Sequence, residues 1–203
     1  MVLSGRIPTD IIGIILMNKK RKKIIKFIIC GFVAVVLLTI ATGALWWYGC
    51  FLPGWIQWKT YESEFGGTNV TLKSRRLSVR DGVTGDEVFW KTQADWFVQD
   101  IVIKDIDRDG EEEMILLVWK HGNYGNHMPF WVEKNDKALK QHIFIYKYDE
   151  TREKKVRPIW MSSQIEYEIT SISSGEDSFL NVKDRSGNTR VWMWRDFGLK
   201  LVR

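Results

Sequence analysis

An acidic run in the middle of the chain has the residue types and spacing of a metal-binding loop. Residues 105–113 read DIDRDGEEE, with acids at positions 1, 3, 5 and 9 and a glycine at position 6. Carboxylates spaced in this way can surround one hard cation with oxygen ligands, and Ca²⁺ is the cation that best matches them. The alternative is an acidic turn without metal, because Asp and Gly are common turn residues in their own right.

The run departs from an EF-hand in two respects. Leu116 stands at position 12, where an EF-hand loop carries its bidentate glutamate. The flanking segments Val98–Ile103 and Met114–Trp119 read as strands rather than helices, since the first alternates and the second is continuously apolar. The sequence therefore predicts a cation site between two strands.

The pattern Asp-x-Asp-x-Asp-Gly-x-x-Glu between two apolar strands resembles the calcium loop of FG-GAP and VCBS repeats, the blades of integrin-α-type β-propellers. The resemblance covers Leu77–Trp119, about one blade, and the Gly-Ala-Pro tract that ends such repeats is absent. It implies a structural Ca²⁺ and a blade-like sheet. The ligands that it implies are the side chains of Asp105, Asp107, Asp109 and Glu113 and the backbone carbonyl of Glu111.

The remainder of the second half of the chain reads as short strands separated by turn signals. Such spacing is typical of an all-β domain, here with ten to twelve strands. The predicted strands, besides the two above, are Arg76–Val79, Val88–Trp90, His142–Tyr148, Ile165–Ile172, Ser178–Val182 and Val191–Trp194. About 140 residues hold only two or three blades, whereas a closed propeller needs about four or more. We therefore expect blade-like antiparallel sheets in a partial propeller or a sandwich.

A long uncharged segment precedes this domain. No charged residue occurs between Phe27 and Trp58, and the run up to Tyr48 is apolar and closes on three aromatic residues. About 20 apolar residues suffice to cross a bilayer. Lys19–Lys26 flanks only the N-terminal side, so the positive-inside rule places the N-terminus in the cytoplasm. The sequence predicts a plasma-membrane protein that contacts lipid through Phe27–Tyr48.

Four regions follow from this reading: a basic cytoplasmic N-terminus (1–26), a transmembrane helix (27–48), a juxtamembrane linker (49–64) and an extracytoplasmic β-domain (65–203). A cleaved signal peptide ending near Ala41 is the alternative to the anchor. A translation start at Met17 is a further hypothesis. Cys30 and Cys50 lie ~30 Å apart along a helix and cannot pair within one chain.

The charge distribution argues against a nucleic-acid-binding protein. The net charge is +5, but residues 1–58 hold seven Lys/Arg and one acid, which leaves −1 for the rest. A nucleic-acid-binding domain should carry its own basic excess. The basic character of the chain therefore belongs to the anchor, and we expect no nucleic-acid partner.

No known catalytic motif occurs in the sequence, so an enzyme is not the expected class. The loop from His121 to His127 is polar and could contact a partner; with His142 elsewhere it lacks the spacing of a zinc site. The leading expectation is an anchored, calcium-stabilised module that binds a protein or carbohydrate at the cell envelope. The alternatives are an accessory or sensor subunit of a membrane complex and, third, an envelope hydrolase built around this loop.

Overall fold

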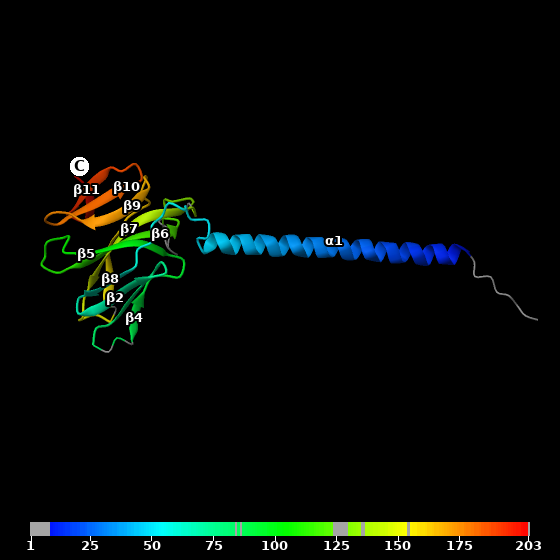
Figure 1. Ribbon diagram of the computed structural model, residues 1–203, viewed down its shortest axis with the longest axis horizontal. Coiled ribbons are helices and arrows are strands. Elements are labelled where there is room, and N and C mark those ends of the chain that lie inside the picture. Colours follow the sequence, from blue (N-terminus) through cyan, green and yellow to red (C-terminus); the bar gives the residue numbers. More distant parts are fainter. Residues whose placement is uncertain are drawn as a thin grey trace, which may run out of the picture. The chain divides into compact units, whose positions relative to one another are not determined.

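The computed structural model describes residues 9–83, 85, 87–123, 130–134, 137–153 and 155–202, with side chains from Arg21 onward. The chain divides into two compact units, Met1–Phe51 and Leu52–Arg203. Among these described residues, the first unit holds a single long helix and the second holds twelve strands (Figure 1).

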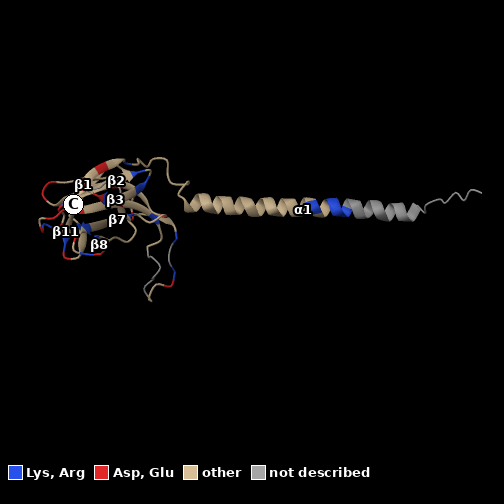
Figure 2. Cartoon of the chain, turned by 90° about the horizontal axis from the view of Figure 1, so that it is seen from below, with Lys and Arg blue, Asp and Glu red and all other residues tan. Residues whose placement is uncertain are grey.

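The helix α1 runs from Thr9 to Trp47. Its part from Arg21 to Trp47 is long and apolar enough to cross a membrane and is not buried by the protein. Lys and Arg gather at the start of this part, and the rest is free of charge (Figure 2). Gly49 (φ 67°) ends the helix, because its amide and that of Cys50 bond back to the last turn as in a Schellman motif. The helix thus begins earlier than the expected span of 27–48.

The second unit consists of three four-stranded antiparallel sheets, each formed by consecutive strands, as expected for blade-like sheets. The first contains β1 (Tyr61–Phe65), β2 (Thr68–Lys73), β3 (Arg76–Asp81) and β4 (Val88–Lys91). The second contains β5 (Phe97–Lys104), β6 (Glu113–His121), β7 (Leu139–Tyr148) and β8 (Val156–Met161). The third contains β9 (Ile169–Ser174), β10 (Phe179–Asp184), β11 (Thr189–Arg195) and β12 (Gly198–Leu201).

The second sheet is the middle layer, and both of its faces are buried. Side chains alternate along each strand, so β6 sends Leu116 into the core shared with the first sheet and Leu117 into the core shared with the third. β6 is buried along its whole length, which confirms the prediction from its continuous apolar sequence. Face-to-face stacking of consecutive sheets is the arrangement of neighbouring propeller blades, and none of the sheets formed by the described residues closes into a barrel.

Several strands that the sequence did not predict lie at the edges of sheets. β1, β8 and β12 bury few of their residues, so their sequences carry little apolar alternation. Pro158 is tolerated in β8 because this strand lies at an edge. β2 also lacked a prediction, and the strand expected at Ile165–Ile172 begins only at Ile169.

The segment 52–58 packs on the β-domain instead of forming a separate linker. Ile56 is buried with Phe97 and Trp119, and Trp55 and Trp58 pack against this cluster. The domain therefore begins before the expected boundary at 65, and the two tryptophans contact protein. We call this end, which holds the start of β5 and the end of β6, the linker end.

The opposite end of the sheets, here called the distal end, holds the β5–β6 and β7–β8 turns. Glu113 at the start of β6 pairs with Lys147 near the end of β7, so the two turns lie side by side. The β1–β2 turn joins them, since a Cβ at Gly66 would overlap the Tyr148 ring. Gly66 (φ 56°) and Gly67 (φ 74°) form a two-residue hairpin turn that needs positive φ at both positions.

A buried amide network ties the middle sheet to the third sheet at the linker end. A β-bulge between Val98 and Asp100 turns the Gln99 side chain toward β9. Its Nε2 donates to the carbonyls of Ile169 (3.1 Å) and Thr170 (2.9 Å). Its Oε1 accepts from Trp119 Nε1 (2.7 Å) and Gln141 Nε2 (2.8 Å). Every polar atom of this buried side chain is therefore hydrogen-bonded.

Candidate metal centre

The acidic loop connects β5 to β6 and curls around its own carboxylates. Asp105 accepts the backbone amides of Arg108 (2.7 Å) and Gly110 (3.0 Å). Asp107 accepts that of Asp109 at 3.2 Å. Positive φ angles at Arg108 (67°) and Gly110 (92°) let the backbone turn this tightly. The local sequence, rich in Asp and Gly, is sufficient to dictate this shape.

Three of the five predicted ligands come together. One carboxylate oxygen each from Asp105, Asp107 and Asp109 lies within 4.8 Å of the others. Oxygens that bind one Ca²⁺ at roughly 2.3–2.6 Å can lie up to about 5 Å apart, so this spacing fits a shared cation. Among the residues that the structure describes, this is the one group of three or more His, Cys, Asp or Glu that could hold a metal.

Glu113 closes the loop from its base. Its side chain is fully buried, and its Oε2 accepts the backbone amide of Ile106 at 2.9 Å. Its Oε1 has no hydrogen-bond donor among the described residues and lies 3.5 Å from Lys147 Nζ. Burial, which disfavours the charged form, raises the pKa of Glu113 to about 7, against the opposing effect of the Ile106 amide. A bound cation would favour the ionised form of this carboxylate.

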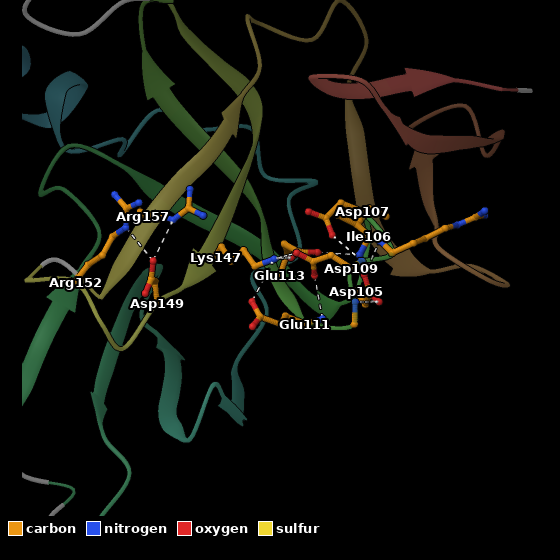
Figure 3. A network of polar contacts seen from close by, with 12 residues as sticks. Asp105, Ile106, Asp107, Asp109, Glu111, Glu113, Lys147, Asp149, Arg152 and Arg157 are labelled. Carbon is orange, nitrogen blue, oxygen red and sulfur yellow. Dashed lines mark hydrogen bonds and ion pairs between the residues drawn. The ribbon is translucent and has the colours of Figure 1, made fainter.

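Lys147 supplies the positive charge of the centre, and sequence reasoning missed it. Its ammonium group pairs with Asp109, with Glu111 at 3.3 Å and with Glu113 at 3.5 Å (Figure 3). Despite burial, the hydrogen bonds that its ammonium group donates to Asp109 and Glu111 raise the pKa of Lys147. The signal in the sequence was a lysine inside the alternating apolar segment HIFIYKY. In the structure Lys147 is only 7% exposed, and a lysine buried to this degree needs an acidic partner.

The two neighbouring aspartates differ in their electrostatic environment. Burial, added to the charge of Asp109, raises the pKa of Asp107 despite the opposing charge of Lys147. The hydrogen bond from Lys147 lowers the pKa of Asp109. Lys147 therefore neutralises one side of the loop, and the Asp105–Asp107 side keeps the excess negative charge that a cation would bind.

The fifth predicted residue, Glu111, directs its side chain to Lys147. Its expected contribution was its backbone carbonyl, and a side chain engaged with Lys147 is compatible with that contribution. All candidate ligands are oxygens and none is His or Cys, which is the donor set of a hard cation such as Ca²⁺.

The structure shows no group of histidines that could hold a metal among the described residues, as a site built around the His121–His127 loop would require. His127 lies outside them. His142 is buried in β7 with its Nδ1 3.1 Å from the Ser162 carbonyl, and burial lowers its pKa to about 4. Its imidazole is therefore neutral near pH 7. His121 places its Nδ1 3.1 Å from the Lys137 carbonyl.

A polar cleft of about 600 Å³ lies beside the acidic loop at the distal end. It is bordered by turns from the first two sheets and offers both charges. The lining residues are Gly66, Glu111, Glu112, Lys147, Tyr148, Asp149, Glu150, Thr151 and Arg157. Lys147 thus belongs both to the cleft and to the acidic centre. Cation binding in the loop would therefore change the electrostatic environment of a ligand in the cleft.

Comparison with known proteins adds no assignment. No model of a known protein family matches this chain, and no curated protein is significantly similar to it in sequence.

The stretch Leu77–Trp119 that resembles one FG-GAP or VCBS blade contains β3 to β6 and so straddles two sheets. The resemblance therefore describes the end of one sheet and the start of the next.

Proposed function

We propose that this protein is a single-pass membrane protein that presents a calcium-stabilised, blade-like β-domain as a binding module at the cell envelope. The observation that carries the proposal is the acidic centre itself. Three aspartate oxygens converge beside the fully buried carboxylate of Glu113, one oxygen of which is not hydrogen-bonded. Such a group carries a large desolvation cost that a divalent cation would offset.

The role of the cation is structural in this proposal. The loop joins β5 and β6 of the middle sheet, and the two faces of this sheet contribute to both large cores. A cation that orders the loop would therefore stabilise the pairing of β5 with β6. The three stacked four-stranded sheets support a relation to FG-GAP or VCBS blades. That analogy of fold favours a protein or carbohydrate ligand, and the cleft bordered by Lys147 is where we place it.

The cation is tested by thermal melts of residues 52–203 in EDTA and in excess Ca²⁺. Binding to the folded state alone at ~100 Kd adds ~2.7 kcal/mol, which corresponds to a rise of several degrees in Tm. Asp107→Asn should abolish the rise. Glu112→Gln is the matched control, because Glu112 is exposed in the same loop and is not a predicted ligand. An unchanged Tm in the wild type would make residues 105–113 an ordinary acidic turn.

The topology is tested with a membrane-impermeant maleimide on intact cells. A single cysteine at the exposed Phe197, in a chain with Cys30 and Cys50 replaced by serine, should be labelled without lysis. Labelling only after lysis would place the β-domain in the cytoplasm.

Binding at the cleft is tested with a photo-crosslinking residue at Thr151, compared with one at Ser186 in the β10–β11 turn of the linker end. We expect an adduct at Thr151 that does not form when EDTA is present before irradiation. Equal adducts at both positions would contradict a ligand at the distal end.

A further inference from the structure

The linker end carries a positive surface. The β2–β3 turn lies there, since the amide of Val98 at the start of β5 bonds to the carbonyl of Arg75 (3.0 Å). Lys73, Arg75 and Arg76 surround this turn, and one acid, Asp95, lies near Arg76. The guanidinium of Arg75 stacks on Trp58 of the 52–58 segment at 4.4 Å. The distal end is the reverse, with six acids and one Arg between 105 and 113.

The chain between β6 and β7 leaves the domain at this same end, because β6 ends at His121 and β7 begins at Leu139. At its middle stand Phe130 and Trp131, with 95% and 70% of their surfaces exposed. The two rings contact each other edge to face, 4.9 Å between centroids, outside either core. In sequence they belong to an apolar run, MPFWV (128–132), inside an otherwise polar connection.

The chain that connects α1 to this end of the domain is short. Helix α1 ends at Trp47 and the domain begins at Leu52. Five residues span at most about 18 Å, so a bilayer crossed by α1 lies within that distance of the linker end. Phe130 stands nine residues from both His121 and Leu139. Nine extended residues cover up to about 30 Å, so the aromatic pair can reach the same surface.

We propose that Phe130 and Trp131 insert into the interfacial layer of the bilayer that α1 crosses. The β-domain is then held to the membrane at a second point. Trp and its aromatic neighbours are favoured at this depth because their rings are amphipathic. The basic β2–β3 turn faces the same surface and attracts anionic headgroups. This inference rests on the proposed membrane-spanning role of α1.

A bilayer fits the aromatic pair better than a protein partner does, for two reasons. The pair lies at the end of the domain that the chain from α1 enters, and not at the distal end, where the cleft and the acidic centre lie. The charge of the linker end also complements anionic lipid. A second copy of the chain would meet the same positive surface on itself and would be repelled.

The test uses the full chain in nanodiscs of phosphatidylcholine and phosphatidylglycerol, with Cys30 and Cys50 replaced by serine. A fluorophore is attached at Lys134→Cys, three residues beyond Trp131. The matched control is Phe197→Cys, which replaces an 88% exposed residue in the β11–β12 turn of the distal end. Nitroxide-labelled lipid should quench the label at 134 several-fold more than the label at 197. Phe130→Ser with Trp131→Ser should reduce quenching at 134 to the control level, and since both rings are exposed the fold should survive.

Equal quenching at 134 and 197 in chains that resist carbonate extraction would overturn the inference. Shielding of the label at 134 without lipid quenching, increasing with the number of chains per disc, would show that another copy covers the pair and would also overturn it. Release of the chain by carbonate would instead contradict the proposed spanning role of α1, so the two failures are distinguishable.

Discussion

The linker end and the distal end of the β-domain hold buried polar groups of opposite kinds. At the linker end the neutral amides of Gln99 and Gln141 are satisfied within a network of four strands, β5, β6, β7 and β9. At the distal end the carboxylate of Glu113 is buried with one oxygen that accepts no hydrogen bond from the described residues. A neutral network completed by protein needs nothing else, whereas an incomplete charged one needs a proton, a lysine or a cation. We infer that the linker end stabilises the stacking of the sheets, and that the stability of the distal end depends on pH and on bound cation.

The largest expected effect is at the linker end. Gln99→Leu keeps the volume but leaves Trp119 Nε1 and the Ile169 and Thr170 carbonyls without this partner. Each unsatisfied buried group costs ~1–3 kcal/mol, so we expect a loss of about 3–5 kcal/mol in the free energy of unfolding. Urea unfolding of residues 52–203 measures it. The exposed Gln57→Leu is the control, and equal effects of both would remove the role assigned to the network.

Acid should weaken the linker half through His142. Its folded pKa of about 4 lies below the ordinary 6.5, so the unfolded chain binds more protons between these values. Stability then falls as pH drops from 6.5 to 4, by up to about 3 kcal/mol.

Glu113 acts in the opposite sense in the ion-free domain. Its folded pKa of about 7 exceeds 4.5, so its contribution is present at low pH and is lost as pH rises to 7. The difference between wild type and His142→Gln, measured by urea unfolding from pH 4 to pH 7, therefore isolates the histidine. If the free energies of unfolding of the two proteins changed in parallel with pH, the lowered pKa assigned to His142 would be contradicted.

Removing the lysine should make the distal end more dependent on metal. Lys147→Gln leaves Asp109, Glu111 and Glu113 without their shared counter-charge. Because Asp109 and Glu111 are partly exposed, we expect a loss of only ~1–2 kcal/mol in EDTA. The Tm rise caused by Ca²⁺ should grow. Arg108→Gln, the same charge change within the acidic loop itself, is the control. A smaller Ca²⁺ effect in Lys147→Gln would show that the lysine assists the cation instead of replacing it.

The smallest expected effect concerns the turns. The distal β1–β2 turn uses Gly66 and Gly67 at positive φ, whereas the β2–β3 turn at the linker end uses Ser74 (φ 51°) and Arg75 (φ 66°). Ser74→Asn should stabilise the domain by ~0.5 kcal/mol, since Asn tolerates this conformation better. Differential scanning calorimetry should show a Tm rise of about 1–2 °C. Ser78→Asn inside β3 should give no rise.

Local patterns were enough to predict several features. The alternation in β5 and β7 and the continuous apolar run in β6 predicted three strands of the middle sheet. Such predictions work because the burial of each position favours an apolar residue at that same position. The spacing of Asp105, Asp107 and Asp109 predicted their convergence, since a loop rich in Asp and Gly folds on its own backbone. The apolar run before Tyr48 predicted α1 but not its start, because its first turns carry no apolar signal of comparable length.

Features that depend on pairing between distant segments were not accessible in this way. Lys147 reaches the acidic loop only through its register with Glu113, and Gln99 reaches Ile169 only because two sheets stack. The segment 52–58 looked like a linker because its packing surface is supplied by Phe97 and Trp119, forty or more residues later. The sequence by itself determined which residues favour burial, which favour a turn and which can bind a cation. The tertiary structure decided which of them meet, because register and stacking bring together side chains whose separation along the chain carries no signal.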